Sequence, residues 1–257
     1  MIRVLVTGAN GQLGKSIAKM AAKYPEIAFS FKDATVLDIT NPISVQDAFR
    51  TGSFNFCINC AAYTHVEQAE KDPEIAFLIN AEGVKNVSMA CKTNSVVLIH
   101  ISTDYVFDGE KRTPYTINDL PNPINEYGKS KLKGEQYVKR LLQKYHIIRT
   151  SWLYSEFGNN FYKTIIEKAK TEKILYVTDE QIGCPTNAHN LAQHILGIVM
   201  DNNENYGIHH FTDDEPMTWY GFAEKILREN GFKEKVRLEK PKNYRTFAAR
   251  PSYSVLN

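Results

Sequence analysis

The sequence predicts an α/β protein built on a doubly wound parallel sheet, because short β-branched runs alternate with amphipathic helical stretches over residues 1–150. A glycine-rich turn follows the first run, and polar residues gather where later runs end. Ligands of such sheets bind outside the carboxyl ends of the strands. We therefore expect a nucleotide-binding domain over 1–150. A smaller α+β substrate-binding cap is expected over 151–257, with some segments returning to the first domain.

The first unit is a strand (Ile2–Val6), a glycine-rich loop (Thr7–Gly14) and a helix (Lys15–Lys23). The three glycines of the loop permit a tight turn, a close approach to a pyrophosphate and packing of the helix on the strand. An ordinary glycine-rich turn can have the same spacing. Its place at the first strand-to-helix turn favours a dinucleotide site.

The second strand is expected over Ile27–Phe31, and an acid at the end of this strand usually binds an adenosine 2′-hydroxyl. Ser30 stands there instead, with Lys32 beside it, so a 2′-phosphate is tolerated and NADPH is slightly favoured over NADH. Val36–Ile39 is counted as the third strand. It carries Asp38, which either hydrogen-bonds the adenine edge or caps its own turn; we favour the adenine contact.

Small residues at Cys60–Thr64 fit a floor on which a cofactor lies close to the backbone. Thr103 comes at the end of a later strand, where it can meet a side chain of the following helix.

The remaining strands are expected at Phe54–Asn59, Val96–Ile101 and Tyr145–Thr150, and the helices at Ser44–Arg50, Glu74–Thr93 and Asn125–Leu142.

Tyr127 and Lys131 are four residues apart in the last of these helices, so their side chains lie on one face. An ammonium near 4 Å from a phenol, at an effective dielectric constant of ~20, contributes roughly 4 kcal/mol. That would lower the phenol pKa by about three units and allow proton exchange near neutral pH. The alternative is a solvated helix face that carries a tyrosine by chance.

Composition excludes several classes of partner. The chain has 31 Lys and Arg against 29 Asp and Glu, with no long run of like charges, so neither nucleic acid nor a membrane is expected. It has no apolar stretch of membrane-spanning length, and Met1 leads directly into the first strand, which predicts a cytoplasmic protein. Four scattered cysteines predict neither disulfides nor zinc binding, and we expect no metal.

The cap is expected to contain helices at Asn187–Met200 and Thr218–Asn230 and a strand-like run at Tyr206–Phe211. Near the end of the chain, Arg250 is a candidate contact for a phosphate or diphosphate. A solvated terminal arginine is the other interpretation.

Four motifs of the first half are T-G-A-N-G-Q-L-G, N-C-A-A-Y-T, S-T-D-Y-V-F-D-G and Y-G-K-S-K, and with them the chain resembles the extended short-chain dehydrogenase/reductases. Four further motifs are similar to those of dTDP-4-dehydrorhamnose reductases: R-T-S-W-L-Y at 149–154, G-N-N-F at 158–161, D-E-Q-I-G-C-P-T at 179–186 and A-R-P at 249–251. The likeness covers nearly the whole chain and implies a Rossmann-like fold.

The resemblance implies reduction of the C4 keto group of dTDP-4-dehydro-6-deoxy-L-hexose to dTDP-L-rhamnose with NADPH or NADH. By this resemblance, Tyr127 donates the proton, Lys131 lowers its pKa and holds the nicotinamide ribose, and Thr103 hydrogen-bonds the keto oxygen. The substrate side comprises Thr103, Asp104, Tyr105, Trp152 and Arg250. The other expected cofactor contacts are Gly8, Asn10, Gly11, Gln12, Leu13, Gly14, Asp38, Ile39, Cys60, Ala61, Ala62, Tyr63 and Thr64.

Two other activities are compatible with parts of this pattern. In sugar-nucleotide 4,6-dehydratases the threonine is followed by Asp and Glu that act as acid and base, but Tyr105 occupies the Glu position here, so reduction is favoured. A non-catalytic dinucleotide-binding subunit, resembling methionine adenosyltransferase β, stays open. Some relatives dimerise through magnesium; we find no matching acidic positions and keep a homodimer as an open expectation.

Overall fold

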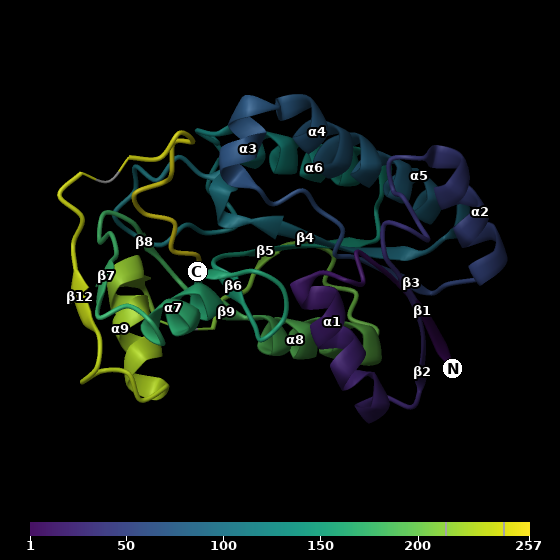
Figure 1. Cartoon of the computed structure of the whole chain (residues 1–257). Coiled ribbons are helices and arrows are strands. Elements are labelled where there is room, and N and C mark those ends of the chain that lie inside the picture. Colours follow the sequence, from purple (N-terminus) through teal and green to yellow (C-terminus); the bar gives the residue numbers. More distant parts are fainter. Residues whose placement is uncertain (214, 244) are drawn as a thin grey trace.

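The computed structural model describes residues 1–213, 215–243 and 245–257 (Figure 1). Its centre is a six-stranded sheet in the order β10-β5-β4-β3-β1-β2, in which every neighbouring pair is parallel. The predicted doubly wound parallel sheet is confirmed. The strands are β1 (Ile2–Thr7), β2 (Ile27–Lys32), β3 (Phe56–Asn59), β4 (Val97–Thr103), β5 (Tyr145–Thr150) and β10 (Gly207–His210).

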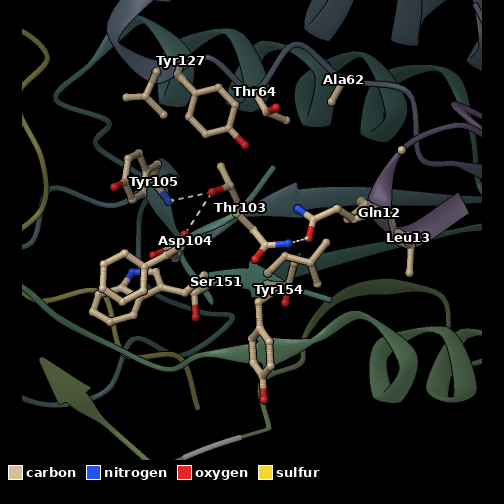
Figure 2. Close-up of a pocket in the computed structure, with 18 of the residues that line it drawn as sticks. Gln12, Leu13, Ala62, Thr64, Thr103, Asp104, Tyr105, Tyr127, Ser151 and Tyr154 are labelled. Atoms are coloured by element: carbon tan, nitrogen blue, oxygen red, sulfur yellow. Dashed lines mark hydrogen bonds between the residues drawn. The ribbon is translucent and has the colours of Figure 1, made fainter. Parts of the chain in front are cut away.

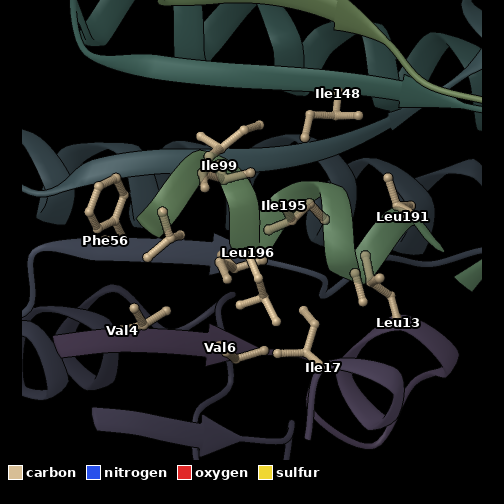
Figure 3. Packing of buried hydrophobic residues seen from close by; sticks show 14 of the residues in the cluster. Val4, Val6, Leu13, Ile17, Phe56, Ile99, Ile148, Leu191, Ile195 and Leu196 are labelled. Carbon is tan, nitrogen blue, oxygen red and sulfur yellow. The ribbon is translucent and has the colours of Figure 1, made fainter. Parts of the chain in front are cut away.

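Helices cover both faces of this sheet. On one face lie α1 (Gln12–Met20) and α8 (Ala188–Met200), and on the other lie α2 (Pro42–Gly52), α5 (Val84–Asn94) and α6 (Glu126–Leu141). Because side chains alternate along a strand, Val4 and Val6 join the first hydrophobic cluster and Leu5 joins the second. Figure 3 shows the first cluster, in which α8 packs its apolar face onto the strands.

Two expectations for the first half need correction. Val36–Ile39 is not a strand; it is a turn segment in which Asp38 accepts hydrogen bonds from the backbone and hydroxyl of Thr40. The single helix expected over Glu74–Thr93 is divided into α4 (Pro73–Phe77), a π-helical segment (Leu78–Gly83) and α5, and is preceded by α3 (Val66–Lys71).

The cap has its own hydrophobic core between α7 (Phe161–Ala169) and α9 (Trp219–Glu229). Its strands pair as β6 (Leu153–Tyr154) with β9 (Thr186–Asn187), β7 (Ile174–Tyr176) with β12 (Arg237–Glu239), and β8 (Ile182–Gly183) with β11 (Met217–Thr218). Two elements from the second half of the chain, α8 and β10, do not belong to the cap. The chain returns through them to the central sheet before it forms α9. The domain boundary at residue 150 stays a prediction.

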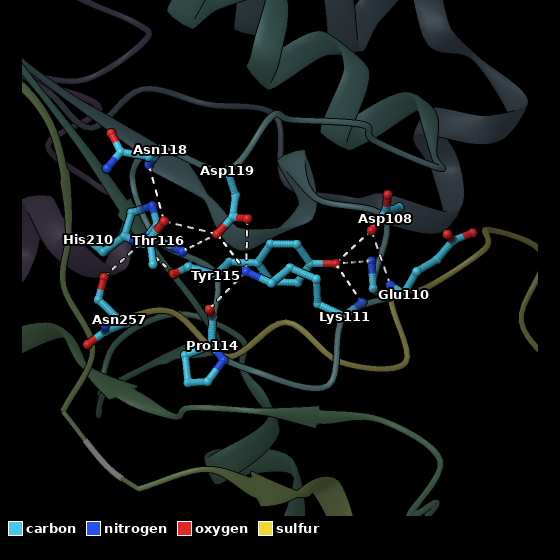
Figure 4. Close-up of polar contacts among 11 residues, drawn as sticks. Asp108, Glu110, Lys111, Pro114, Tyr115, Thr116, Asn118, Asp119, His210 and Asn257 are labelled. Atoms are coloured by element: carbon cyan, nitrogen blue, oxygen red, sulfur yellow. Dashed lines mark hydrogen bonds and ion pairs between the residues drawn. The ribbon is translucent and has the colours of Figure 1, made fainter.

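The C-terminal segment connects the two halves. Asn257 donates its backbone N–H to the carbonyl of Tyr115 at 2.9 Å (Figure 4). Nδ1 of His210 lies 3.1 Å from the Tyr115 carbonyl oxygen and 3.1 Å from the backbone oxygen of Asn257. Tyr253 forms a bridge with Ile182 of the cap. Residues 250–257 therefore lie between the central sheet and the cap.

Candidate active site

A cavity of about 570 Å³ lies at the carboxyl ends of β4 and β5, with the cap forming its opposite wall (Figure 2). This is where a parallel α/β sheet binds its ligands. The structure brings together side chains from both halves of the chain here, including Gln12, Thr103, Tyr127, Trp152 and Arg250.

The glycine-rich loop borders one end of this cavity, and two of its glycines leave no room for a side chain. Gly8 has φ +63°, and a Cβ there would lie 2.5 Å from the backbone nitrogen of Ala61. A Cβ on Gly14 would lie 2.6 Å from the Cα of Ala9. The loop ends at the N-terminus of α1, whose free backbone N–H groups and dipole suit a pyrophosphate. These residues therefore fit a dinucleotide.

Gln12, predicted as a pyrophosphate contact, also joins the loop to the cap. Its side-chain carbonyl accepts hydrogen bonds from Asn160 Nδ2 at 2.8 Å and from Ser155 Oγ at 3.1 Å. Asp38 and Ile39 lie outside the set of residues that lines the cavity, and Ile39 is buried beneath Gly83. Their predicted contact with adenine stays a prediction.

The end of the second strand was placed one residue too early. β2 continues to Lys32, whose carbonyl accepts from the backbone N–H of Ala9, so Asp33 is the residue at the strand end. Asp33 Oδ2 accepts from Asn10 Nδ2 at 2.5 Å, and its other oxygen accepts from Thr35. The hydroxyl and backbone of Thr35 lower the pKa of this carboxyl. An ionised acid therefore lies beside the loop, where we had expected none.

Asn80, which lies in the π-helical segment, forms hydrogen bonds with the backbone of the floor at Cys60–Thr64. Asn80 accepts from the Tyr63 N–H at 2.8 Å and donates to the Tyr63 carbonyl at 2.9 Å and to Ser130 Oγ at 3.0 Å. A Cβ on Gly134 of α6 would lie 2.2 Å from the Asn80 carbonyl oxygen. Sequence reasoning placed Asn80 on a helix but missed this contact with the floor.

Thr103, Tyr127 and Lys131, the predicted catalytic set, line one wall of the cavity. Thr103 Oγ1 donates to Asp104 Oδ1 at 2.9 Å and accepts from the Tyr105 N–H at 3.2 Å. The ring of Tyr127 meets that of Tyr105 edge to face, with 5.9 Å between centroids. The close approach of α6 depends on Gly128, because a Cβ there would lie 2.1 Å from the Tyr105 carbonyl oxygen.

Burial is the largest cause of the pKa shifts of Tyr127 and Lys131. It lowers the pKa of Lys131 to about 8, against the opposing charge of Glu135, and the ammonium donates to the Ile101 carbonyl at 2.6 Å. Burial raises the pKa of Tyr127, although a hydrogen bond with Thr103 opposes it. This direction is opposite to the one expected from spacing. A phenol that keeps its proton at neutral pH is nevertheless in the form that a proton donor requires.

On the substrate side, Trp152 lies flat on Trp219, with 3.5 Å between ring centroids and 5° between planes. Trp152 has φ +47°, and a Cβ on Gly183 would lie 2.6 Å from its ring. Trp219 Nε1 donates to Gln181 Oε1 at 2.9 Å. Sequence reasoning missed Trp219. Its only signal was the D-E-Q-I-G-C-P-T motif, which supplies both Gln181 and Gly183.

Arg250 is not a solvated terminal side chain. Its side chain is 21% exposed, and it lines the cavity. Nη1 donates to the Tyr105 hydroxyl at 3.3 Å, and Nη2 pairs with Glu67 Oε1 at 2.8 Å. The guanidinium is thus held in the wall of the cavity, where it can meet an anion.

Within the residues that the structure describes, no group of three or more His, Cys, Asp or Glu is arranged to hold a metal ion. In the same ranges, the helices are all too short or too polar to cross a membrane. The thiol of Cys60, in the floor, has its pKa raised by burial.

Comparisons with known proteins agree with the geometry. Residues 2–257 match the family model described as RmlD substrate binding domain. The chain is 39% identical to a dTDP-4-dehydrorhamnose reductase of Aggregatibacter actinomycetemcomitans over 100% of this chain and 91% of that protein. It is 35% identical to the Escherichia coli dTDP-4-dehydrorhamnose reductase over 89% of this chain and 78% of that protein.

A solved structure of the Bacillus anthracis dTDP-4-dehydrorhamnose reductase, in complex with NADP, superposes with a TM-score of 0.95 at 41% identity. The match covers 100% of this chain and 91% of that one. The fold is thus shared with that reductase along the whole length of the chain. The chain belongs to the RmlD substrate binding domain family, as its resemblance to dTDP-4-dehydrorhamnose reductases predicted.

Proposed function

We propose that this protein reduces the C4 keto group of dTDP-4-dehydro-6-deoxy-L-hexose to give dTDP-L-rhamnose, with NADPH or NADH, for the synthesis of cell-surface polysaccharide. The main support for this proposal is that Thr103, Tyr127 and Lys131 all line one cavity, which lies between the glycine-rich loop and the aromatic side chains of the cap. Relatives that match this chain over nearly all its length are reductases of this kind.

The cofactor and three side chains have separate roles in the reduction. The nicotinamide, when bound, supplies the hydride. Tyr127 keeps its proton at neutral pH, because burial raises its pKa, and donates it to the oxygen that becomes the C4 hydroxyl. Thr103 turns its single hydroxyl proton from Asp104 Oδ1 to the same oxygen when the ketone is bound, and so orients the ketone. Lys131, held by its hydrogen bond to the Ile101 carbonyl, contacts the nicotinamide ribose.

The remaining polar groups hold the two ends of the substrates. Backbone N–H groups at the start of α1 bind the pyrophosphate of the cofactor. Arg250 binds the diphosphate of the sugar nucleotide, since a guanidinium in the wall of the cavity matches phosphate oxygens in charge and geometry. The stacked indoles of Trp152 and Trp219 form a flat apolar wall for the deoxysugar.

The test is direct. The purified chain is given NADPH and the dTDP-4-keto sugar, and nucleotide oxidation is followed together with formation of dTDP-L-rhamnose by mass spectrometry. We expect turnover with both coenzymes. Binding of NADPH without any oxidation would contradict the proposal and favour a regulatory dinucleotide-binding subunit.

We also propose that the protein works in the cytoplasm and assembles as a homodimer. Four cysteines scattered along the sequence, and the dTDP-sugar substrate proposed here, support the cytoplasmic location. The homodimer rests on the resemblance to relatives that dimerise. Light scattering during size-exclusion chromatography tests the assembly, and a monomer at micromolar concentration would contradict it.

A further inference from the structure

Glu67, on the first turn of α3, holds a segment that lies far away in the sequence. Its Oε1 accepts from Arg250 Nη2 at 2.8 Å, across 183 residues of chain. Its Oε2 accepts from the backbone N–H groups of Phe247 at 2.9 Å and Ala248 at 3.2 Å. One carboxylate thus receives three donors from a four-residue stretch.

The same stretch is tied to the helix that carries Tyr127. Asn125, the N-cap of α6, donates from Nδ2 to the Ala249 carbonyl at 2.8 Å. Glu70, one turn along α3 from the first carboxylate, accepts from the backbone N–H of Glu126 at 2.8 Å. α3 therefore fixes both the start of the catalytic helix and the segment that presents the arginine.

Glu67 does not line the cavity itself, whereas Val66 and Arg250 do. Burial raises the pKa of this carboxyl, but its hydrogen bonds with Arg250, Ala248 and Phe247 outweigh burial, so its pKa is lowered and it stays ionised at neutral pH. An ionised carboxylate in this place keeps the guanidinium in one orientation.

We propose that Glu67 is a positioning residue that orders Arg250, and the backbone at 247–250, for the diphosphate of the sugar nucleotide. This rests on the proposed function. A long arginine side chain loses rotamer freedom when it binds an anion, and prior ordering reduces that loss. Glu67 therefore contributes to affinity for the nucleotide diphosphate and little to the chemical step.

The experiment titrates dTDP into the full-length protein by calorimetry and measures kcat and KM for the keto sugar. Glu67→Gln has the same shape and lacks the charge. Because the pair is partly exposed, we expect dTDP affinity to fall about three- to tenfold. The KM for the sugar nucleotide should rise by the same factor, whereas kcat should stay within twofold and the KM for NADPH should not change.

Two matched variants identify the cause. Glu74→Gln removes one negative charge from an exposed position on the neighbouring α4 and should leave dTDP affinity unchanged. Glu67→Asp keeps the carboxylate and should retain more affinity than Glu67→Gln. A larger loss in Glu67→Asp than in Glu67→Gln would overturn the inference, because it would mean that the length of the side chain matters more than its charge.

A double-mutant cycle tests whether the effect passes through Arg250. In an Arg250→Met background, Glu67→Gln should weaken dTDP binding by less than about twofold. The same loss in both backgrounds, or unchanged affinity in Glu67→Gln alone, would overturn the inference. A wild-type protein that binds dTDP without reducing the sugar would refute only the proposed function. One that binds no dTDP would refute both.

Discussion

The two ends of the cavity are shaped by different parts of the chain. At the cofactor end the backbone decides, because Gly8 and Gly14 leave no space for a Cβ and belong to one continuous loop. At the substrate end side chains decide, and they come from distant positions: Trp152 stacks on Trp219, and Glu67 holds Arg250. The comparison shows that the proposed cofactor subsite is built from two short segments, the loop and the floor at Cys60–Thr64, whereas the proposed substrate subsite depends on pairs of side chains from distant parts of the chain.

Tyr127 lies where the two ends meet, so its removal should have the largest effect on turnover. Positioned acid catalysis contributes about 10²- to 10⁴-fold, and Tyr127→Phe should lower kcat by that factor. The ring still packs on Tyr105, so the dissociation constants of NADPH and dTDP should not change. Calorimetry and steady-state kinetics check both. A kcat within tenfold of the wild type at pH 7 would show that another group delivers the proton.

Gly8→Ala should disrupt the cofactor end alone. The new Cβ would lie 2.5 Å from the Ala61 nitrogen at φ +63°. Backbone strain of this kind costs about 1–3 kcal/mol, so NADPH affinity should fall about tenfold or more. Gly231→Ala is the control, because Gly231 has φ +74° with no atom within 4 Å of its ideal Cβ. If dTDP affinity fell as much as NADPH affinity, the two ends would not be independent.

The contrast explains what sequence alone could predict. The glycine loop and the Tyr127–Lys131 pair are short motifs whose spacing directly determines their geometry, and the central sheet follows from alternating strands and helices. Asp33 was missed because hydrophobic periodicity does not fix a strand end to one residue. The direction of the Tyr127 pKa was wrong because four-residue spacing does not reveal the depth of burial, and burial is the largest cause of the raised pKa.

The substrate end was less accessible to sequence analysis. Trp219 belongs to an amphipathic helix of ordinary appearance, and Glu67 belongs to α3, a short helix that the sequence did not predict. Their partners, Trp152 and Arg250, lie 67 and 183 residues away, and no short motif carries such a pairing. These contacts exist only once the cap and the C-terminal segment have folded against the sheet.

Asp104 provides a pH test of the substrate end. Burial raises its pKa to about 6, although Ser254 and Thr103 oppose it. Its ordinary value is 3.8, so the folded state binds more protons, and stability falls as pH rises from about 4 to about 6. Asp104→Asn should remove this loss and gain on the order of 2 kcal/mol over the wild type between pH 4 and pH 7. Thermal unfolding at the two pH values measures it. A constant difference between the two proteins would contradict the prediction.

The smallest expected effect concerns Asp33, which tests whether the cofactor end also selects through a side chain. Asp33→Asn keeps the oxygen that accepts from Thr35 and removes the charge beside the loop. A 2′-phosphate should then be repelled less, and the ratio of kcat/KM for NADPH to that for NADH should rise about three- to tenfold. Since Asp33 is only partly buried, the change should shrink at high ionic strength. Asp47→Asn, an exposed acid on α2, should leave the ratio unchanged. An unchanged ratio for Asp33→Asn at low salt would place the adenosine ribose away from this acid and leave coenzyme selection to the backbone of the loop.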